Sequence, residues 1–385
     1  MNIVETFAKP STAEMQSRLD RLQEHMREQG FSGYVMADPS NVLWLTNFAN
    51  YVHERPFILF VPAKGRLTFL MPRLELDHVT ARSIGDVEFV TYTEFPAPVG
   101  KRWNDAFGEL LPTGSEKIAV EPTCPLMISN EIGPRVEIST LIDDIRAVKS
   151  EYELGRIAYA CRLVSEAHIQ FLENAGEGVT QAQVNGTSGK TLFENLVKDD
   201  PALNPFATSI HTMFQNAAAS YDPHNFSDLD MTMRDGGPHI SVFNSLLNGY
   251  GAEIERTFFI NHVPEEARRP FDIMMEARQR AYELTKPGAV MSDIDRAVTE
   301  VYEKHDVMHA FRHRAGHGLG VTAHEGPFLA EGDMRVVEPG MVYTIEPGIY
   351  FPGLGGFRFS DTVVTIDDGL VQLTHSPETL EELTL

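Results

Sequence analysis

The sequence has little cysteine, no long apolar run and few basic residues relative to acidic ones. Only Cys124 and Cys161 occur among 385 residues, which excludes a disulfide framework and a Cys-x-x-Cys metal or redox motif. No run approaches the roughly 18 apolar residues of a membrane helix, and residues 1–6 lack the basic start of a signal peptide. We therefore expect a cytoplasmic protein without a membrane segment.

The charge balance argues against one class of partner. Thirty-two Lys and Arg residues face 55 Asp and Glu residues, which gives a net charge of −23. Contact with nucleic acid relies on clustered Lys and Arg side chains that neutralise phosphates. We expect no nucleic-acid partner, and instead a small-molecule substrate.

The length of the chain predicts two domains. Near the N-terminus, Ser11-Thr12-Ala13-Glu14 is typical of a capping box, and apolar residues then recur at helical spacing until Gly30. The short apolar runs that follow predict strands, so residues 1–148 are expected to form an α/β domain. These runs are Tyr34–Met36, Phe57–Val61, Leu67–Leu70 and Ile118–Val120.

The second part of the chain, residues 149–385, has a different pattern. Apolar residues from Leu154 to Phe171 recur at intervals of three and four, which predicts a long amphipathic helix. A second helix is expected from roughly Arg269 to Leu284, before Lys286-Pro287-Gly288. Strand-like segments fall between and after these helices, so the layout is α+β.

Histidines and carboxylates are concentrated between His313 and Asp361. They occur in short segments that Gly and Pro residues interrupt, such as His313–Gly320, His324–Pro327 and Thr344–Gly348. Titratable groups spaced in this way can converge from neighbouring strands. We expect these segments to form the floor of a catalytic site.

Two of the segments carry a resemblance to a known family. The run His317-x-Leu319-Gly320-Val321-x-Ala323-His324-Glu325 resembles the signature of aminopeptidase P and proline dipeptidase, in the creatinase/aminopeptidase P/prolidase (M24, pita-bread) family. Gly249–Phe258 looks like the segment that carries two aspartate metal ligands in the peptidases. The resemblance covers roughly residues 150 to 380 and implies a curved antiparallel sheet under two pairs of helices.

The metal-binding positions of that family are only partly kept here. The resembling peptidases hold two divalent ions with Asp, Asp, His, Glu and Glu, and the corresponding residues are Val242, Glu253, His317, Glu346 and Ser360. Valine supplies no ligand atom, and a neutral serine is a poor one. We therefore expect no metal cofactor. If one ion such as Mn²⁺ does bind, the expected ligands are Glu253, His317 and Glu346.

The same positions resemble creatinase, the member of the family that works without metal. Glu255, just before Arg256-Thr257, matches the glutamate that contacts the guanidinium group of creatine, and Glu346 matches the second substrate glutamate. His224, in Pro223-His224-Asn225, matches the acid/base histidine. The resemblance implies a catalytic set and a substrate-binding set. These are His224, Glu255, Glu346 and His324 for catalysis, and His317, Glu253, Arg55 and Arg358 for substrate binding.

The chemistry of these residue types supports the assignment. Hydrolysis of an amide or amidine needs a base for water and an acid for the leaving nitrogen, and one histidine can serve as both in turn. Two carboxylates can hold a planar cationic group by charge-assisted hydrogen bonds. His224 suits the first role, and Glu255 and Glu346 suit the second.

An anion clamp and a partner follow from the resemblance as well. Creatinase holds the carboxylate of its substrate with arginines, one of them from a second subunit. Arg55 lies in the N-terminal region that reaches across the dimer in relatives, and Arg314 and Arg358 are alternatives. We therefore expect a homodimer.

Several residues receive a structural interpretation instead. Gly186–Thr191 looks like a phosphate-binding loop, but Val184 stands where the first glycine of that motif belongs. His168, His211, His239 and His309 are expected to have structural roles, with His168 on the apolar face of its helix.

These observations predict a hydrolase of a C–N bond, in an amidine or amide of a small polar substrate, that is creatinase-like and independent of metal. One alternative is an Xaa-Pro dipeptidase or aminopeptidase that uses one or two divalent ions. A second alternative is a catalytically inactive pita-bread protein that serves as a binding module.

Overall fold

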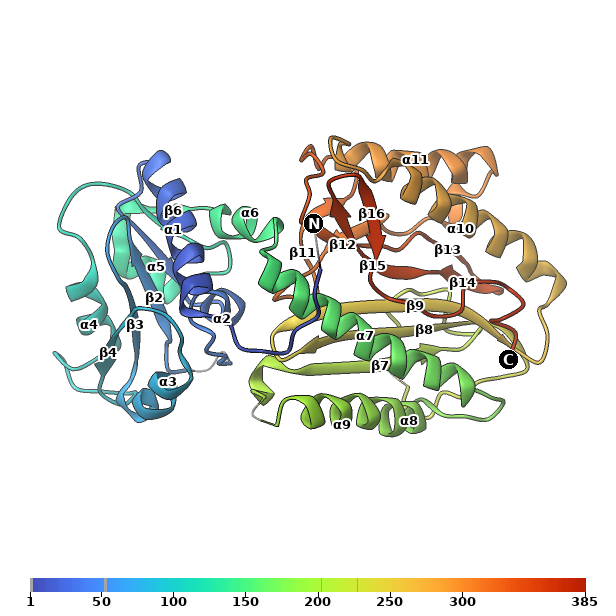
Figure 1. The fold of residues 1–385 in the computed structure, drawn as a ribbon, viewed down its shortest axis with the longest axis horizontal. Helices are drawn as coiled ribbons and strands as arrows, with labels where there is room; N and C mark the ends of the chain where they lie inside the picture. Colours follow the sequence, from blue (N-terminus) through green and yellow to red (C-terminus); the bar gives the residue numbers. More distant parts are fainter. Residues whose placement is uncertain (1–2, 52–53, 202, 227) are drawn as a thin grey trace. The chain divides into compact units, whose positions relative to one another are not determined.

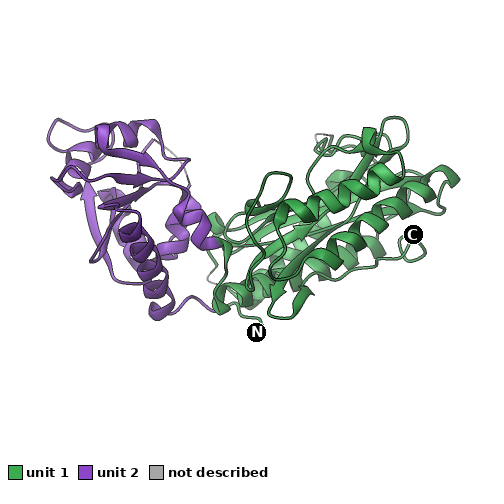
Figure 2. Cartoon of the chain, turned by 90° about the horizontal axis from the view of Figure 1, so that it is seen from above, with its two compact units in different colours: residues 1–7, 147–385 green, residues 8–146 purple. Residues whose placement is uncertain are grey.

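The computed structural model describes residues 3–51, 54–201, 203–226 and 228–385. The chain forms two compact units, one of residues 8–146 and one of residues 147–385 with the segment that ends at Phe7 (Figure 2). The backbone N–H of Thr6 donates to the carbonyl of Gly155 at 3.1 Å, which ties this segment to the second unit. Among the described helices, none has both the length and the apolar character that crossing a bilayer requires.

The unit of residues 8–146 is an α/β layer structure. Its described strands form one mixed sheet in the order β4-β3-β2-β1-β5-β6, with parallel pairs at both ends and antiparallel pairs in the middle. The strands are β1 (Gly33–Met36), β2 (Ile58–Pro62), β3 (Leu67–Pro72), β4 (Val87–Tyr92), β5 (Ile118–Val120) and β6 (Val136–Ile138). The helices are α1 (Thr12–Glu28), α2 (Pro39–Thr46), α3 (Leu76–Arg82), α4 (Trp103–Leu110), α5 (Leu126–Ile132) and α6 (Leu141–Ala147).

The predicted elements of this unit are confirmed. The first helix begins after Ser11, whose side chain accepts a hydrogen bond from the backbone N–H of Glu14. The four predicted strands are β1, β2, β3 and β5. The sequence analysis missed β4 and β6, the two edge strands of the sheet. An edge strand is covered less completely than a central one, so its apolar pattern is weaker.

A buried carboxylate lies at the end of β5. Glu121 accepts hydrogen bonds from the backbone N–H groups of Ala37 and Asp38, both at 2.6 Å, and from the side-chain amide of Asn41 at 2.7 Å. It therefore fixes the turn between β1 and α2. Burial raises the pKa of Glu121 to about 7, although these hydrogen bonds act in the opposite direction.

This pKa predicts a pH-dependent stability for the unit. An acid whose pKa is raised in the folded state stabilises the fold at low pH and loses that contribution as the pH rises. Relative to a Glu121→Gln variant, the wild type should lose up to about 3 kcal/mol of unfolding free energy between about pH 4.5 and about pH 7. Trp44 and Trp103, the two tryptophans of the chain, both lie in this unit, so their fluorescence in urea can follow its unfolding. A constant difference across this pH range would contradict the prediction.

The larger unit is built on a strongly bent antiparallel sheet (Figure 1). Its described strands run in the order β11-β10-β12-β15-β9-β8-β7, with β16 paired to β15. A separate hairpin consists of β13 and β14. The bounds are β7 (Ser209–Gln215), β8 (Gly236–Leu247), β9 (Tyr250–Ile260), β10 (Gly316–Gly318), β11 (Glu325–Leu329), β12 (Val342–Ile345), β13 (Gly348–Phe351), β14 (Gly355–Arg358), β15 (Ser360–Ile366) and β16 (Gly369–Gln372).

Helices cover one face of this sheet. The helix α7 packs along β8 and β9 and against α9, and α10 packs against α11 (Figure 1). Both predicted helices are confirmed; α10 begins four residues before Arg269 and contains Pro270. The segment Gly186–Thr191 is helical and follows the short helix α8, so a strand does not precede it. The bounds are α7 (Glu151–Glu173), α8 (Gln181–Val184), α9 (Lys190–Asp199), α10 (Glu265–Leu284) and α11 (Met291–Lys304).

Alternation along the long strands separates the two faces of the sheet. On β8, Ser241 points to the helix side, where its hydroxyl lies 2.7 Å from Nε2 of His168. The next residue, Val242, lines a cavity on the opposite side. On β9, Glu253 and Glu255 face the same cavity. The side chain of the next residue, Arg256, lies on the helix side and is fully buried. Successive strand residues point to opposite faces, so each strand supplies both a site and a core.

Buried ion pairs on the helix side of the sheet join β15 to β9 and α10. Asp361 accepts from Arg256 at 2.9 Å and from Arg278 at 2.7 Å. Arg256 also donates to the carbonyls of Glu255, Ser360 and Pro377. Since Glu255 and Ser360 belong to neighbouring strands, this arginine fixes β9 against β15 directly behind the cavity.

Candidate functional site

The open face of the bent sheet contains a cavity of about 400 Å³. Its walls come from β7, β8, β9 and the loops around β10 and β12, which are far apart in the sequence. The lining residues are His211, Met213, His224, Phe226, Val242, Asn244, Glu253, Glu255, His313, Arg314, Ala323, His324, Glu346 and Arg358. The segments predicted to form a catalytic floor therefore do converge.

Two glycines place His317 on the floor of this site. A Cβ at Gly316 would lie 2.1 Å from the carbonyl oxygen of Thr344, and one at Gly318 would lie 2.5 Å from that of Gly326. Such distances are impossible for a real side chain, so only glycine lets β10 approach β12 and β11. His317, between the two glycines, is fully buried.

His317 has a defined tautomer. Its Nδ1 lies 3.1 Å from the carbonyl oxygen of Gly318, which can only accept a hydrogen bond. Nδ1 therefore carries the proton, and the lone pair of the neutral ring is on Nε2. This Nε2 lies 3.3 Å from Oε1 of Glu346 and 3.7 Å from Oε2 of Glu253, and it makes no hydrogen bond to the described residues. A lone pair that faces two carboxylates is repulsive unless a positive charge lies between them.

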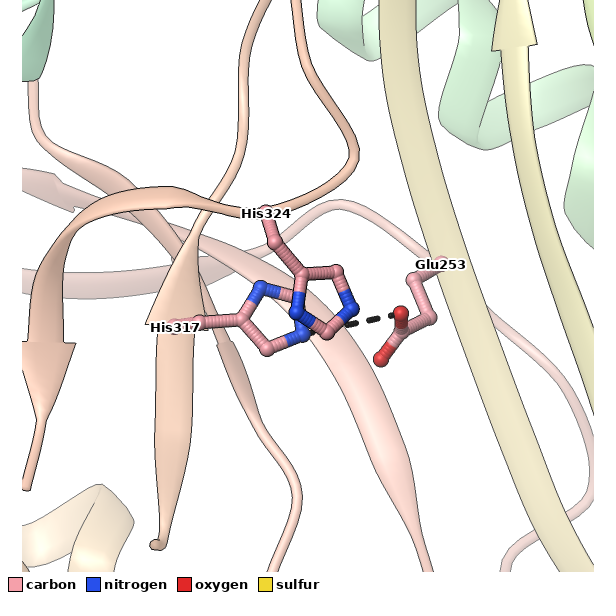
Figure 3. Close-up of side chains that lie close together, drawn as sticks. All are labelled: Glu253, His317 and His324. Carbon is pink, nitrogen blue, oxygen red and sulfur yellow. Dashed lines mark ion pairs between the residues drawn. The ribbon is translucent and has the colours of Figure 1, made fainter. Parts of the chain in front are cut away.

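His324 lies directly over His317. The ring centroids are 3.7 Å apart and the planes differ by 17°, so the two imidazoles stack with their edges toward Glu253 (Figure 3). One ligand atom from each of these three residues lies within 4.8 Å of the others. Burial, together with the neighbouring His317, lowers the pKa of His324 to about 4. Burial also lowers the pKa of His317, so both imidazoles favour the neutral form that metal ligation requires.

The carboxylates of the cavity also have perturbed pKa values. Burial raises the pKa of Glu253, and it raises the pKa of Glu346 to about 7, which the nearby Arg358 opposes. Glu253 is held by the hydroxyl of Ser360 at 2.7 Å and by the side-chain amide of Asn244 at 2.5 Å. Its orientation is therefore fixed by β8 and β15.

Glu255 forms a buried ion pair with Arg358. Nη2 of Arg358 donates to Oε1 of Glu255 at 2.9 Å, and Nε contacts the second oxygen. The remaining nitrogen, Nη1, lies 3.2 Å from the hydroxyl of Tyr350 and 3.5 Å from the carbonyl of Pro223. Burial raises the pKa of Glu255, and the guanidinium of Arg358 acts in the opposite direction.

Other predicted site residues are placed as follows. His224 is exposed at the cavity and lies close enough to affect the pKa of His313 and His324. Arg314 lines the cavity, with its guanidinium 4.7 Å from the ring of Phe328. Arg55 lies in the other unit, where it pairs with Glu54 and Glu94. Its role as an anion clamp stays a prediction, as do the homodimer and the cytoplasmic location.

The sequence analysis missed several cavity residues. His313 was assigned no role, yet its Nε2 lies 2.7 Å from the hydroxyl of Tyr350, which also contacts Arg358. His211 was given a structural role, and it is exposed on the cavity wall. Asn244 could have been found, because it is two residues after Val242 on the same face of β8. His168 and His239 are buried, as expected.

The residues present fit one divalent ion better than two. Two neutral imidazoles and a carboxylate are a common ligand set for a single transition metal. The Nε2 of His317, which makes no hydrogen bond to the described residues, supplies a lone pair that faces Glu253 and Glu346. Val242 and Ser360 add no anionic oxygen, and the hydroxyl of Ser360 is already used on Glu253.

Two family models and an Xaa-Pro dipeptidase match this chain. Residues 155–367 match the model of metallopeptidase family M24, and residues 18–148 match the creatinase/prolidase N-terminal domain. The chain is 27% identical to an Xaa-Pro dipeptidase of Pyrococcus furiosus over 376 residues, which are 95% of this chain and 100% of the relative.

Solved structures show the same fold. A prolidase of Pyrococcus horikoshii superimposes with a TM-score of 0.82 at 23% identity, and the match covers 94% of this chain and 99% of that one. The N-terminal domain of the FACT complex subunit SPT16 from chickpea gives a TM-score of 0.81 at 16% identity, over 97% and 99% of the two chains. The expected N-terminal domain and the expected C-terminal domain with a curved antiparallel pita-bread sheet are confirmed. Such a fold does not by itself imply one activity.

One expectation is wrong. The sequence analysis predicted a site without a metal cofactor, whereas the chain matches the model of a metallopeptidase family and is similar to an Xaa-Pro dipeptidase. That prediction was based on Val242 and Ser360, which offer no anionic ligand atom to a metal ion. It did not count His324 as a ligand, because stacking of His324 on His317 depends on a chain turn that the sequence does not reveal.

Proposed function

Because this chain belongs to metallopeptidase family M24, we propose that it hydrolyses the C–N bond of a short peptide with one divalent metal ion held by Glu253, His317 and His324. The observation that carries the proposal is the Nε2 of His317, which faces the carboxylates of Glu253 and Glu346 and makes no hydrogen bond to the described residues. The similar Xaa-Pro dipeptidase suggests an Xaa-Pro dipeptide as the first substrate to test. A cavity of about 400 Å³ suits a molecule of that size.

Different residues of the cavity can carry out different steps of the hydrolysis. A divalent ion bound there supplies Lewis acidity. Glu346, whose pKa is raised to about 7 by burial, can accept a proton from water at neutral pH. His224, at the exposed side of the cavity, can deliver a proton to the leaving nitrogen. Arg314, whose Nε donates to the carbonyl of Gly316, lines the cavity over Phe328, where its terminal nitrogens can bind the carboxylate of the substrate.

A second candidate reaction is favoured by a separate observation. His224, Glu255 and Glu346, the three positions that match working residues of creatinase, line one cavity. This supports hydrolysis of an amidine or amide C–N bond in a small polar molecule, with His224 as base and acid in turn and Glu346 beside the planar group. A panel that contains Xaa-Pro dipeptides, other dipeptides and small cyclic amidines distinguishes the two reactions.

Metal dependence is the direct test. The purified protein should contain up to one equivalent of Mn, Co, Zn or Fe by elemental analysis. EDTA should lower turnover at least about tenfold, and added Mn²⁺ should restore it. His317→Ala should lose the metal, whereas His211→Ala, a change of histidine on the wall of the same cavity, should keep it. Full turnover in a metal-free preparation would overturn the proposal.

A further inference from the structure

One end of the cavity is apolar. Met213 on β7 and Val242 on β8 are paired in the register of the sheet, and both side chains line the cavity. Phe226, from the segment between β7 and β8, lines it as well. It packs against the buried cluster of Val242, Ile240 and Tyr350. Met213, Val242 and Phe226 thus form an apolar wall with one face toward the cavity.

The neighbouring part of the cavity is polar. In the register of β8 and β9, Val242 lies across from Glu255, which is paired with Arg358. Two residues away on the same face, the register of β7, β8 and β9 brings together three polar residues, which are His211, Asn244 and Glu253. An apolar group gains free energy where it removes apolar surface from water. An apolar part of a ligand is therefore favoured at the apolar wall rather than beside these polar side chains.

The order of the strands determines which part of a dipeptide reaches the apolar wall. Arg314, which is proposed to bind the substrate carboxylate, lies two residues before β10, and the proposed metal ligand Glu253 is on β9. In the sheet, β9 has β10 on one side and β8 and β7 on the other. A dipeptide with its carboxylate at Arg314 and its scissile bond near Glu253 therefore extends its N-terminal residue toward β8 and β7.

We propose that the apolar wall of Met213, Val242 and Phe226 binds the side chain of the N-terminal residue of the substrate, and that this side chain is aliphatic, as in leucine or methionine. The inference rests on the proposed function for the direction of the dipeptide, and it adds the class of residue that precedes the scissile bond. A charged or amide side chain at this place would lose hydrogen bonds to water and gain none from the three wall residues.

Val242 is the specificity-determining residue of this site. It lies at the centre of the apolar wall, because it is paired with Met213 on one side and packs against Phe226. Its side chain is 6% exposed, so a polar group introduced there would be largely removed from water. A change at Val242 should therefore alter the preference among substrates more than it alters the fold.

Two dipeptides of similar shape test the preference. Leucine and asparagine side chains are close in size, so Leu-Pro and Asn-Pro differ mainly in polarity. With Mn²⁺ present, the wild type should hydrolyse Leu-Pro with a kcat/KM at least about tenfold higher than that for Asn-Pro. In a calorimeter, EDTA-stripped protein should also bind Leu-Pro at least about tenfold more tightly. The heat-capacity change should be more negative for Leu-Pro, because its binding buries apolar surface.

Substitutions in the apolar wall test the residues themselves. Val242→Thr keeps the branched shape and introduces a hydroxyl, so it should lower the preference for Leu-Pro over Asn-Pro at least about threefold in hydrolysis and in binding. Bound manganese, counted by elemental analysis, should stay as in the wild type. Met213→Gln changes a half-buried residue of the same wall and should act in the same direction, so the test does not depend on one variant.

A matched control and a second pair of ligands complete the test. Val336→Thr makes the same change at a residue that is 45% exposed and is not part of the cavity lining, and it should keep the wild-type preference. Ala-Leu and Ala-Asn vary the C-terminal residue, and Val242→Thr should leave the ratio of their Kd values on stripped protein unchanged. An effect of Val242→Thr on this pair alone overturns the assignment to the N-terminal residue.

The outcomes separate the apolar wall from the proposed function. Metal-dependent hydrolysis of Leu-Pro and Asn-Pro at similar kcat/KM, or a preference that Val242→Thr and Met213→Gln both leave intact, overturns the wall as a binding site while the function stands. If stripped protein prefers Leu-Pro and Val242→Thr removes the preference, but Mn²⁺ restores no hydrolysis, the binding site stands and the function fails. If neither dipeptide is bound or hydrolysed, both proposals are wrong.

Discussion

Replacing His224 with alanine is expected to lower turnover by about 10²–10⁴, with little change in KM. His224 lines the cavity from its exposed side, where it can reach both substrate and solvent. A proton donor that acts on the leaving nitrogen contributes mainly after the substrate has bound. The loss should therefore appear in kcat, measured on the best substrate of the panel.

A matched change controls for this result. His262 is also an exposed histidine of the larger unit, but it pairs with Asp235 and is not part of the cavity lining. His262→Ala should keep wild-type turnover. A His224→Ala protein that turns over normally while His317→Ala is inactive would remove His224 from the mechanism.

The second large effect concerns stability. Asp361→Asn is expected to lower the free energy of unfolding of the larger unit by about 3–5 kcal/mol, because it leaves two buried arginines with one carboxylate fewer. Asp361 is fully buried, and Arg256 and Arg278 both donate to it. Urea unfolding followed by circular dichroism measures the change. The fluorescence of Trp44 and Trp103 should report an unchanged smaller unit.

Glu378 provides the comparison. It pairs with Arg278 at 3.2 Å, but its side chain is 39% exposed. A half-exposed ion pair of this kind contributes at most about 1 kcal/mol. Glu378→Gln should therefore have a much smaller effect than Asp361→Asn. Equal effects would show that burial of Asp361 is not the cause.

The parts of the fold that the sequence predicted are those set by local pattern. The helix over Leu154–Phe171 and the strands at Tyr34–Met36 and Leu67–Leu70 follow directly from periodicity and turn residues. The helix α11 was missed. It begins soon after Pro287-Gly288, and its first residues were not distinguished from that turn. The edge strands β4 and β6 of the smaller unit were missed as well.

The site was predicted in composition and only partly in arrangement. The cavity is lined by Glu253, Glu346 and His224, and His317 lies on its floor. These residues could be predicted because the family resemblance covers the segments that contain them. The partner of Arg358 could not be predicted, because Glu255 is 103 residues away along the chain. The lone pair on Nε2 of His317 is available because Nδ1 donates its proton to the carbonyl of Gly318. That carbonyl belongs to the backbone, so the residue types alone do not reveal this hydrogen bond.

The two-residue alternation along β8, β9 and β15 bears on how such a protein acquires new chemistry. Substitutions at Val242 or Asn244 alter what the cavity presents, while Ser241 and Asp361 on the other face hold the sheet to its helices. Reactivity can therefore drift in single steps without unfolding the molecule, whereas a one-residue insertion in β9 would exchange the two faces at once. Variation among relatives at the cavity-facing positions would then record changes of substrate, and constancy at the intervening ones would record the demands of folding.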